Sequence, residues 1–483
     1  MPKTEEFRSP VIVWFRRDLR ISDHPALSEA LKEGPVIPLY IESSSEEGDW
    51  TAGSASKWWL HQSLAKLSGE LALKGSRLIL RRGNAAKILE ELAKESGAKT
   101  VLCSRSYDAR ILKRDEGVKK KLAAAGVEIR GFNGSLLREP WETRTGSGGP
   151  YKVFTPFWKN YLSGKEFRTP LAEPSKIEAP GKWPASDKLA DWGLEPKINW
   201  AGGMKAFWEP GEKGAARALE TFLPKTPDYP RSRDMPSEEG TSMLSPHLHF
   251  GEISVHQVWD RVQRLKCKTK EEKEGQETFL KELVWREFSY HLLFHFPHTP
   301  EEPLYEQFRD FPWNTDYGEL EAWQKGRTGY PIVDAGMRQL WHLGWMHNRV
   351  RMITGSFLVK DLLLPWQKGA GWFWDTLVDA DLAQNTMNWQ WVGGCGADAA
   401  PFFRIFNPIT QSRKFDPEGN YIRKWVPELG NMPARWIHEP WTASAEVLLE
   451  AGVRLGDNYP EPVVQHDVAR KRALLEYNRF RKR

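Results

Sequence analysis

Cysteine is scarce in this chain. Among its 483 residues there are three cysteines, Cys103, Cys267 and Cys395, and they form no CxxC pair. This count predicts neither a disulfide framework nor a thiolate metal site, and it fits a reducing compartment. The sequence also has no apolar run long enough to cross a bilayer and no signal-peptide-like segment near residue 1. We therefore expect a cytoplasmic protein without a membrane segment.

Several catalytic motifs are missing as well. The sequence has no Walker A motif, no HExxH and no GxSxG, so metal-assisted hydrolysis and acyl transfer have no support and we predict no metal site. The stretch 394-GCGADA-399 matches the spacing of a dinucleotide-binding loop. It follows a tryptophan-bearing helical pattern, whereas a true loop of this kind follows a strand, so we treat the match as chance.

Charge of one sign is not in large excess either. Lys and Arg number 69 against 64 Asp and Glu, and the resulting net charge of +5 favours a polyanionic partner only weakly. Tryptophan, in contrast, is abundant. Of the 24 tryptophans, only Trp14, Trp50, Trp58 and Trp59 lie before residue 130, so the excess belongs to the second part of the chain.

Two kinds of pattern divide the chain. Short β-rich runs at 11–15, 36–41, 78–81, 100–103 and 128–132 alternate with helical patterns such as 55–75 and 84–97, which is typical of a doubly wound parallel sheet. After about residue 205 helical patterns dominate, including one over 349–363. We therefore expect an α/β domain over 1–133, an ordered connector over 134–204 and an all-α domain over 205–483.

Polar side chains follow two of the predicted strands, in 16-RRDLRISDHPAL-27 and 104-SRSYDAR-110. Ligands of parallel sheets bind at the carboxyl ends of strands, so both stretches are candidates for the rim of a pocket. An equally good alternative is that Arg16, Arg17 and Asp18 only cap and salt-bridge the first turn.

Polar residues also recur at helical spacing inside the aromatic helices. Glu282, Trp285 and Arg286 stand at i, i+3 and i+4 and share one helix face, as Asn348 and Met352 do. Their simplest interpretation is a set of salt bridges beside core tryptophans.

Two neighbouring tryptophans, Trp389 and Trp391, point about 200° apart on a helix, so they serve different surroundings. Together with Trp313 and Trp366, Trp389 is either a core residue or part of a chain of one-electron carriers. Periodicity alone leaves both alternatives open.

Six ordered blocks carry a resemblance over nearly the whole chain: 11-VIVWFRRDLRISDHPAL-27, 240-GTSMLSPHLHFGEIS-254, 281-KELVWREF-288, 328-TGYPIVDAGMRQL-340, 345-WMHNRVRM-352 and 388-NWQWVGGCGADAAPFFRIFNP-408. They resemble the photolyase/cryptochrome family. The stretches 58-WWLH-61 and 147-SGGPYKVFTPFWK-159 resemble the class III bacterial photolyases for cyclobutane pyrimidine dimers. The resemblance implies an N-terminal antenna domain and a helical domain that binds FAD, active in its reduced form.

The resemblance also implies residue roles. It places FAD beside Tyr229, Thr241, Ser242, Met243, Leu244, Ser245, Phe279, Trp345, Arg351, Asp379, Ala380, Asp381 and Asn385. It builds the cavity for a flipped-out dimer in UV-damaged DNA from Glu282, Trp285, Asn348, Met352, Asn385 and Trp391. It implies a photoreduction chain of Trp389, Trp366 and Trp313, and contacts to DNA phosphates by Arg233, Arg286, Arg349, Arg404, Gln411 and Lys414.

Relatives that do not repair such dimers are the main alternative. The (6-4) photolyases carry histidines where Asn348 and Met352 stand, and plant cryptochromes carry an aspartate at the position of Asn348, so this chain resembles the dimer-repair enzymes. A cryptochrome-like blue-light receptor is the first alternative, and a flavin-free DNA-binding module is the second. Trp341 is either a core residue or the start of a second electron route.

An antenna chromophore is the last implication of the resemblance. The class III likeness favours methenyltetrahydrofolate, with a deazaflavin or an empty pocket as the alternatives, in a pocket that involves Glu42, Trp58, His61 or Tyr107. We expect the protein to act as a monomer.

Overall fold

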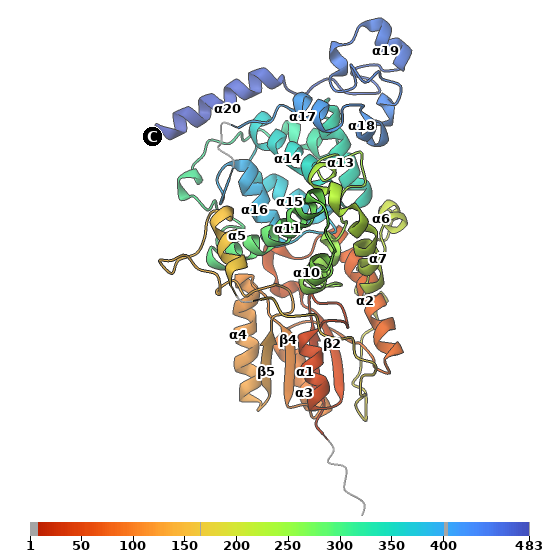
Figure 1. Cartoon of the computed structure of the whole chain (residues 1–483), viewed down its shortest axis with the longest axis vertical. Coiled ribbons are helices and arrows are strands. Elements are labelled where there is room, and N and C mark those ends of the chain that lie inside the picture. The colour runs from red at the N-terminus through yellow and green to blue at the C-terminus, as the bar shows by residue number, and fades with distance from the viewer. Residues whose placement is uncertain (1–7, 165, 400–403, 483) are drawn as a thin grey trace, which may run out of the picture.

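The computed structural model describes residues 8–164, 166–399 and 404–482. A sheet lies at one end of the molecule and a helical assembly at the other (Figure 1). Within the described residues no helix is long and apolar enough to cross a membrane. The same residues contain no group of three or more His, Cys, Asp or Glu side chains that could hold a metal ion.

Five parallel strands form the sheet, in the order β3-β2-β1-β4-β5. They are β1 (Val11–Phe15), β2 (Val36–Glu42), β3 (Ile79–Arg82), β4 (Thr100–Ser104) and β5 (Glu128–Phe132). In the centre, Val11 of β1 pairs with Val36 on one side and with Thr100 on the other. All five residues of β1 are buried, as expected for a strand that is covered on both faces.

Alternate residues of β1 face two different cores. Val13 and Phe15 lie in the cluster formed with α1 (Pro25–Glu33) and α2 (Ser54–Leu73), whereas Ile12 and Trp14 lie in the cluster formed with α3 (Ala85–Ser96) and α4 (Ala109–Ala124). Successive side chains of a strand point to opposite faces, so the helices cover both sides of the sheet. This confirms the predicted doubly wound fold.

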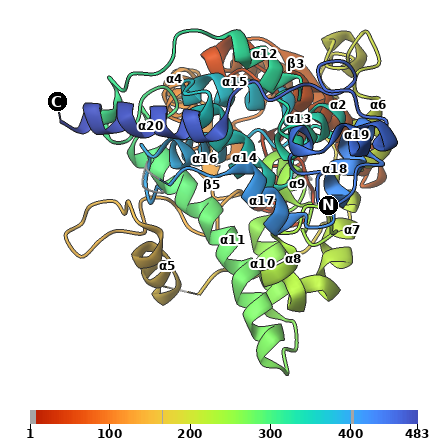
Figure 2. The ribbon, with the colours of Figure 1, turned by 90° about the horizontal axis from the view of Figure 1, so that it is seen from above.

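Helices build the connector and the rest of the chain. They are α5 (Phe154–Ser163), α6 (Gly202–Phe207), α7 (Glu212–Phe222), α8 (Tyr229–Ser232), α9 (Ser245–Phe250), α10 (Val255–Gln263), α11 (Lys270–His295), α12 (Gly318–Gln324), α13 (Pro331–Leu343), α14 (Asn348–Ser356), α15 (Trp366–Thr376), α16 (Leu382–Gly393), α17 (Pro408–Phe415), α18 (Asn420–Trp425), α19 (Ala445–Ala451) and α20 (His466–Arg481). Seen from above, α14 and α16 lie near the middle of this assembly, and α16 packs against α11, α14 and α15 (Figure 2).

One predicted helix is wrong in its length. The pattern over 349–363 is not one α-helix: α14 ends at Ser356, and Phe357–Asp361 form a π-helical turn, η6. Leu363 then takes a left-handed conformation with φ +57, and its carbonyl accepts a hydrogen bond from the Asn314 amide at 2.8 Å. Apolar periodicity does not distinguish such a turn from a continuing α-helix.

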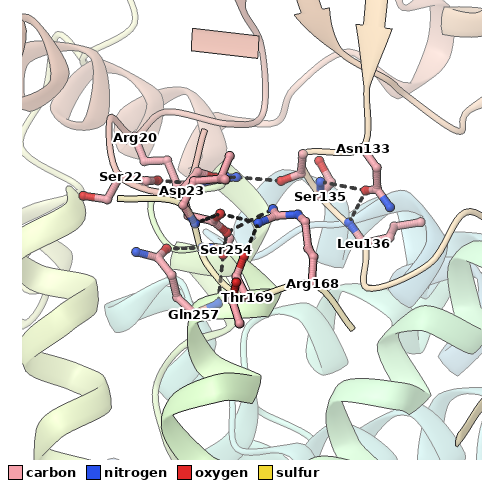
Figure 3. Close-up of polar contacts among 12 residues, drawn as sticks. Arg20, Ser22, Asp23, Asn133, Ser135, Leu136, Arg168, Thr169, Ser254 and Gln257 are labelled. Atoms are coloured by element: carbon pink, nitrogen blue, oxygen red, sulfur yellow. Dashed lines mark hydrogen bonds and ion pairs between the residues drawn. The ribbon is translucent and has the colours of Figure 1, made fainter. Parts of the chain in front are cut away.

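A buried polar network joins the sheet domain, the connector and the helical assembly (Figure 3). The Arg20 guanidinium donates to the carbonyl oxygens of Gly134 at 2.8 Å and Gly251 at 3.0 Å. The Asp23 carboxylate pairs with Arg168 of the connector and accepts a hydrogen bond from the Ser254 hydroxyl. Because each contact joins segments far apart in the sequence, this network fixes the two halves relative to each other.

Candidate active site

The candidate site is a cavity among α14, α15 and α16 that contains about 590 Å³ of empty space, part of it open to solvent. It is lined by Asn348, Arg351, Met352, Gly355, Phe373, Leu377, Asp379, Ala380, Asp381, Gln384, Asn385, Asn388, Trp389, Trp391 and Val392. Nine of the residues singled out in the sequence thus line one cavity: Asn348, Arg351, Met352, Asp379, Ala380, Asp381, Asn385, Trp389 and Trp391.

A chain of polar contacts crosses one wall of this cavity. Nη2 of Arg351 lies 2.8 and 3.1 Å from the two carboxylate oxygens of Asp379. The Ser245 hydroxyl, at the first residue of α9, donates to Asp379 at 2.6 Å, and Nε1 of Trp345 donates to that hydroxyl at 3.3 Å. Arg351 and Ser245 therefore contact the Asp379 carboxylate directly, and Trp345 is linked to it through Ser245.

The neighbouring carboxylate, Asp381, is fully enclosed. It accepts a hydrogen bond from the Tyr290 hydroxyl and lies 3.4 Å from Nδ1 of His249. Burial opposes ionisation of this carboxyl, but the contact with His249 and the positive charges of Arg17 and Arg286 outweigh it, so its pKa lies well below the usual range. Asp381 is thus a fixed negative charge beside the cavity.

Asn385 of α16 is a further polar residue that lines the cavity. It is buried, and its amide nitrogen donates to the carbonyl oxygen of Ala370 at 3.1 Å. The amide nitrogen is therefore engaged, and the amide oxygen is the atom with which Asn385 could accept a proton donor in the cavity.

The remaining predicted cofactor residues form a neighbouring group. The rings of Tyr229 and Phe279 meet edge to face, with centroids 5.3 Å apart. Thr241 and Ser242 make local hydrogen bonds, to the sulfur of Met243 at 3.3 Å and from the Leu244 amide at 3.4 Å. This segment leads directly into Ser245, through which it contacts the cavity wall.

The predicted substrate residues are brought together only in part. Asn348, Met352 and Trp391 line the cavity, whereas Glu282 and Trp285 of α11 do not appear among its described lining residues. Glu282 forms an ion pair with Arg233, and Trp285 stacks on Phe154.

The tryptophans of the predicted photoreduction chain share one hydrophobic core. Trp389 is buried and packs edge to face on Phe373 at 5.0 Å between centroids. Trp366 is also buried in this core, and Trp313 is half-buried against it. Trp391 is half-buried, so the two neighbouring indoles do differ in surroundings. An electron-carrying role for these residues stays a prediction.

Most of the predicted phosphate contacts lie on one side of the cavity. The Arg349 guanidinium lies over the ring of Phe415 at 4.4 Å, and the Lys414 ammonium lies over the same ring at 5.0 Å. Arg404 and Lys414 are exposed, and Gln411 is half-buried.

Arg286 does not share that surface. Its side chain is only 12% exposed, donates to the Ser135 carbonyl at 3.0 Å and lies over the ring of Tyr290 at 5.0 Å. The guanidinium is engaged with the connector and with α11 in this structure, and a phosphate contact by Arg286 stays a prediction.

Comparisons with known proteins agree with this arrangement. Residues 11–175 match the family described as DNA photolyase, and residues 279–479 match the family described as FAD binding domain of DNA photolyase. A deoxyribodipyrimidine photo-lyase from Agrobacterium fabrum is 50% identical over 477 residues, which span 98% of each chain. This chain belongs to the photolyase/cryptochrome family.

Two further relatives, a photolyase and a cryptochrome, are also similar to this chain over most of its length. The crystal structure of a bacterial class III photolyase from Agrobacterium tumefaciens superimposes with a TM-score of 0.95 at 49% identity, covering 100% of both chains. Cryptochrome-2 of Arabidopsis thaliana is 42% identical and covers 97% of this chain, which spans 79% of that protein.

The cavity fits the FAD that this family's domain binds. The aromatic side chains of Phe373 and Trp389 line it together with the polar groups of Arg351, Asp379 and Asn385, a combination that suits a flat ring system with polar edges. Ser245, which donates to Asp379, directly follows the segment that contains Thr241 and Ser242, so the polar side of the cavity continues into that segment. Hydroxyl and backbone donors of this kind suit the phosphates of a dinucleotide.

A second cavity lies between the sheet domain and the helical assembly, with about 920 Å³ of empty space. Arg16, Arg17 and residues 104–108 line it, so the two predicted rim stretches do meet. Arg16 also forms the salt bridge of the alternative interpretation, 2.5 Å from Asp115. Of the candidate antenna residues, Tyr107 lines this cavity and Glu42 lines an adjoining one, whereas Trp58 and His61 belong to neither described lining.

Three residues of the site escaped the sequence patterns. Tyr290, on α11 one turn after Arg286, donates a hydrogen bond to the Asp381 carboxylate. Phe154 stacks on Trp285. Asp234 forms an ion pair with Arg349 at 2.7 Å. The helical spacing of Tyr290 from Arg286 was the one available signal, because the other two contacts join distant segments.

Proposed function

We propose that this chain is a deoxyribodipyrimidine photolyase, a light-dependent lyase that splits cyclobutane pyrimidine dimers in UV-damaged DNA. The observation that carries the proposal is that one cavity joins Asn348, Met352 and Trp391 to the Arg351–Asp379 pair and Asn385. Residues suited to a damaged base and residues suited to a flavin thus line the same space.

When bound, reduced FAD supplies one electron to the dimer after it absorbs blue light. Arg351 and Asp379 would orient the cofactor, and Asn385 would offer its amide oxygen to a hydrogen-bond donor of the cofactor, because its amide nitrogen is held by the Ala370 carbonyl. Asp381 keeps a negative charge at a fixed place, since its pKa is held well below the usual range by its hydrogen bond and the surrounding arginines despite burial.

The substrate residues act on the extruded dimer. Dimer formation weakens base pairing, which lowers the cost of moving the lesion out of the duplex. Trp391 and Trp285 provide apolar surfaces for the lesion, and Asn348 provides hydrogen bonds. Glu282, in its protonated form, would donate a hydrogen bond to a dimer carbonyl and thereby stabilise the negative charge that develops there.

The test is repair itself. UV-irradiated oligo(dT) is mixed with purified, reduced protein, and the return of the ultraviolet absorbance of the bases is followed under blue light and in the dark. Glu282→Ala should cut the repair yield while FAD stays bound. Glu277→Ala is the matched control, because Glu277 lies on the same helix and pairs only with Lys281 among the described residues. Protein that carries reduced FAD but restores no absorbance refutes the proposal and favours the photoreceptor alternative.

We also propose that the cavity between the domains holds the antenna chromophore, methenyltetrahydrofolate. Four of its lining residues are arginines, Arg16, Arg17, Arg105 and Arg114, and Trp14 and Tyr40 add aromatic surface. This lining suits a flat, anionic ligand. The absorption spectrum of the ligand released from purified protein decides between a folate and a deazaflavin, and Arg17→Ala should lower the amount of ligand retained.

The division into an antenna domain (1–133), a connector (134–204) and a helical domain (205–483) is likewise our proposal, although α6 spans its second boundary. Limited proteolysis should cut first within the connector. We further propose that the protein acts as a monomer in the bacterial cytoplasm, on the DNA of the nucleoid. Light scattering measures the molar mass of the protein alone and of its DNA complex. Each mass should correspond to one copy of the 55.6 kDa chain, with the DNA added in the complex.

A further inference from the structure

Four charged side chains form a row on one side of the lesion site, which we call the charge ladder: Glu282, Arg233, Asp234 and Arg349. Arg233 pairs with Glu282 of α11, and the next residue, Asp234, pairs with Arg349 of α14 at 2.7 Å. Two adjacent residues of the turn after α8 therefore contact two helices on different sides of the site. Each side chain is between 19% and 31% exposed, so the ladder is reachable from solvent.

The turn that carries Arg233 and Asp234 is rigid. Backbone amides of residues 233, 234 and 235 donate to the carbonyl oxygens of Tyr229, Arg231 and Ser232 at 3.1 to 3.2 Å. Gly240 lies so close to Ser232 that a Cβ there would stand 2.5 Å from its carbonyl oxygen. Since the turn is held on both sides, a shift of one ladder residue cannot easily occur without the other.

Arg349 depends on Asp234 for its orientation. Among the described residues, Asp234 is the one carboxylate paired with Arg349, the Arg349 Nε has no hydrogen-bond partner, and Nη1 reaches only the sulfur of Met352 at 3.8 Å. The ring of Phe415 supports the guanidinium from one face. Without the Asp234 carboxylate, no other carboxylate among the described residues would hold the Arg349 guanidinium in one orientation on the Phe415 ring.

The ladder contains two positive and two negative groups. A surface built only to attract phosphates would not place carboxylates beside its arginines, because they weaken attraction to any DNA. The two carboxylates therefore have a role other than raising the affinity for DNA. Holding the guanidinium groups in a fixed orientation is such a role.

We propose that Asp234 is a positioning residue that couples phosphate contacts to recognition of the lesion. It holds Arg349 in the orientation that fits the phosphate beside an extruded dimer, and the rigid turn transmits that position through Arg233 to Glu282. The inference rests on the proposed photolyase function. It adds that selection of damaged over intact DNA depends on a carboxylate that touches neither lesion nor flavin.

The experiment uses the full-length protein with FAD bound and two duplexes of one sequence, with and without a single dimer. Fluorescence anisotropy gives both affinities at several salt concentrations. Asp234→Asn should tighten binding to intact DNA, because a negative charge is lost, and should lower the ratio of the two affinities by about fivefold, the size of a typical coupling between neighbouring ion pairs. Asp234→Glu should restore part of the ratio.

Asp228→Asn is the matched control. It removes the same charge from the residue that precedes α8, but Asp228 pairs with Arg231, outside the ladder, at 2.7 Å. The control should change both affinities by one common factor and leave the ratio unchanged. If Asp234→Asn behaves like this control, the positioning role is refuted.

A double-mutant cycle gives a second readout. Glu282→Gln and Asp234→Asn should affect the affinity ratio less than additively, because both act through the same turn. Additive effects overturn the coupling even if Asp234→Asn alone lowers the ratio. If the unmodified protein does not prefer dimer-containing DNA, the proposed function is refuted and the ladder proposal with it. If the unmodified protein does prefer such DNA but Asp234→Asn leaves the affinity ratio unchanged, only the ladder proposal is refuted.

Discussion

The ring of Phe154 lies parallel to the indole of Trp285, with centroids 3.5 Å apart and 8° between the planes. Phe154 opens α5 in the connector, whereas Trp285 belongs to α11 of the helical assembly. One face of the indole is covered by this stack, so only the other face is left for a ligand. The connector therefore packs directly on a residue that we predict to contact the substrate.

Replacement of Phe154 by Leu should loosen Trp285 without removing it. Stacked aromatic pairs contribute about 0.5–1.5 kcal/mol beyond burial, so we expect a roughly two- to tenfold weaker affinity for dimer-containing DNA. FAD content should stay unchanged. Titration of a dimer-containing oligonucleotide measures the effect. Phe167→Leu is the control, since Phe167 packs on Trp259 and not on Trp285, and an equal loss in both variants would contradict the role of the stack.

The fold was predictable because its signals are local. Strand β1 is buried on both faces and therefore consists of apolar residues alone, and α3, which flanks the sheet, carries clear apolar periodicity with Ile88, Leu89 and Leu92 buried. Asn348 and Met352 stand four residues apart on one helix, and both line the cavity as their shared face predicts. Local spacing was sufficient in these cases.

Contacts between distant segments were not predictable in this way. Arg286 shares a helix face with Glu282, but Arg286 donates to Ser135 of the connector whereas Glu282 pairs with Arg233 after α8, so the two side chains meet different surroundings. The stack of Phe154 on Trp285 and the pairing of Asp234 with Arg349 likewise depend on how remote segments pack. A helical spacing fixes a direction on the helix and leaves the partner open.

Two glycines of α15 make a matched pair. A Cβ on Gly369 would stand 2.0 Å from the indole of Trp389, whereas a Cβ on Gly371 would meet no atom within 4 Å. Gly369→Ala should therefore displace Trp389, lower the free energy of unfolding by about 1–3 kcal/mol and slow photoreduction. Gly371→Ala should raise the free energy of unfolding by up to about 1 kcal/mol through helix propensity. Denaturant titration compares the two, and equal effects would show that Trp389 moves aside freely.

Trp366→Phe tests the photoreduction chain. Trp366 is buried in the same core as Trp389, and phenylalanine is much harder to oxidise than tryptophan, so photoreduction of oxidised FAD should lose most of its rate. Repair by chemically reduced protein should continue, since it does not need this chain. Trp374→Phe is the control: Trp374 is also buried on α15 but packs on Trp50. An undiminished rate of photoreduction in Trp366→Phe would exclude Trp366 as the main carrier.

Trp341 is not the core residue that its helix suggested. Its side chain is 57% exposed and stacks on Trp372, with centroids 6.2 Å apart and 8° between the planes. Trp372 directly precedes Phe373, which packs on Trp389, and we propose that Trp372 and Trp341 form an alternative electron route. Any photoreduction that remains in Trp366→Phe should disappear when Trp341→Phe is added. If transient absorption shows the same residual rate in the double variant, Trp341 carries no electrons.

Glu287 gives the protein a specific pH dependence. Its carboxylate is buried between α11 and the connector and accepts hydrogen bonds from the Tyr161 hydroxyl at 2.8 Å and the Leu137 amide at 2.9 Å. Burial raises its pKa to about 7 even though the neighbouring Arg286 acts in the opposite direction. An unfolded glutamate titrates near about pH 4.3. Between these values the folded chain keeps a proton that the unfolded chain has lost.

The stabilising contribution of protonated Glu287 is therefore fully present below about pH 4.3 and disappears as the pH rises through about 7. Relative to Glu287→Gln, the native protein should lose up to about 3 kcal/mol in free energy of unfolding between about pH 5 and pH 8. Denaturant midpoints of both proteins across this range measure the difference, in which the contributions of all other groups cancel. Glu277→Gln, at an exposed position of the same helix, should run parallel to the native protein. A constant difference for Glu287→Gln would mean that Glu287 is already ionised in the folded state at pH 5, held so by Arg286 and the connector amides.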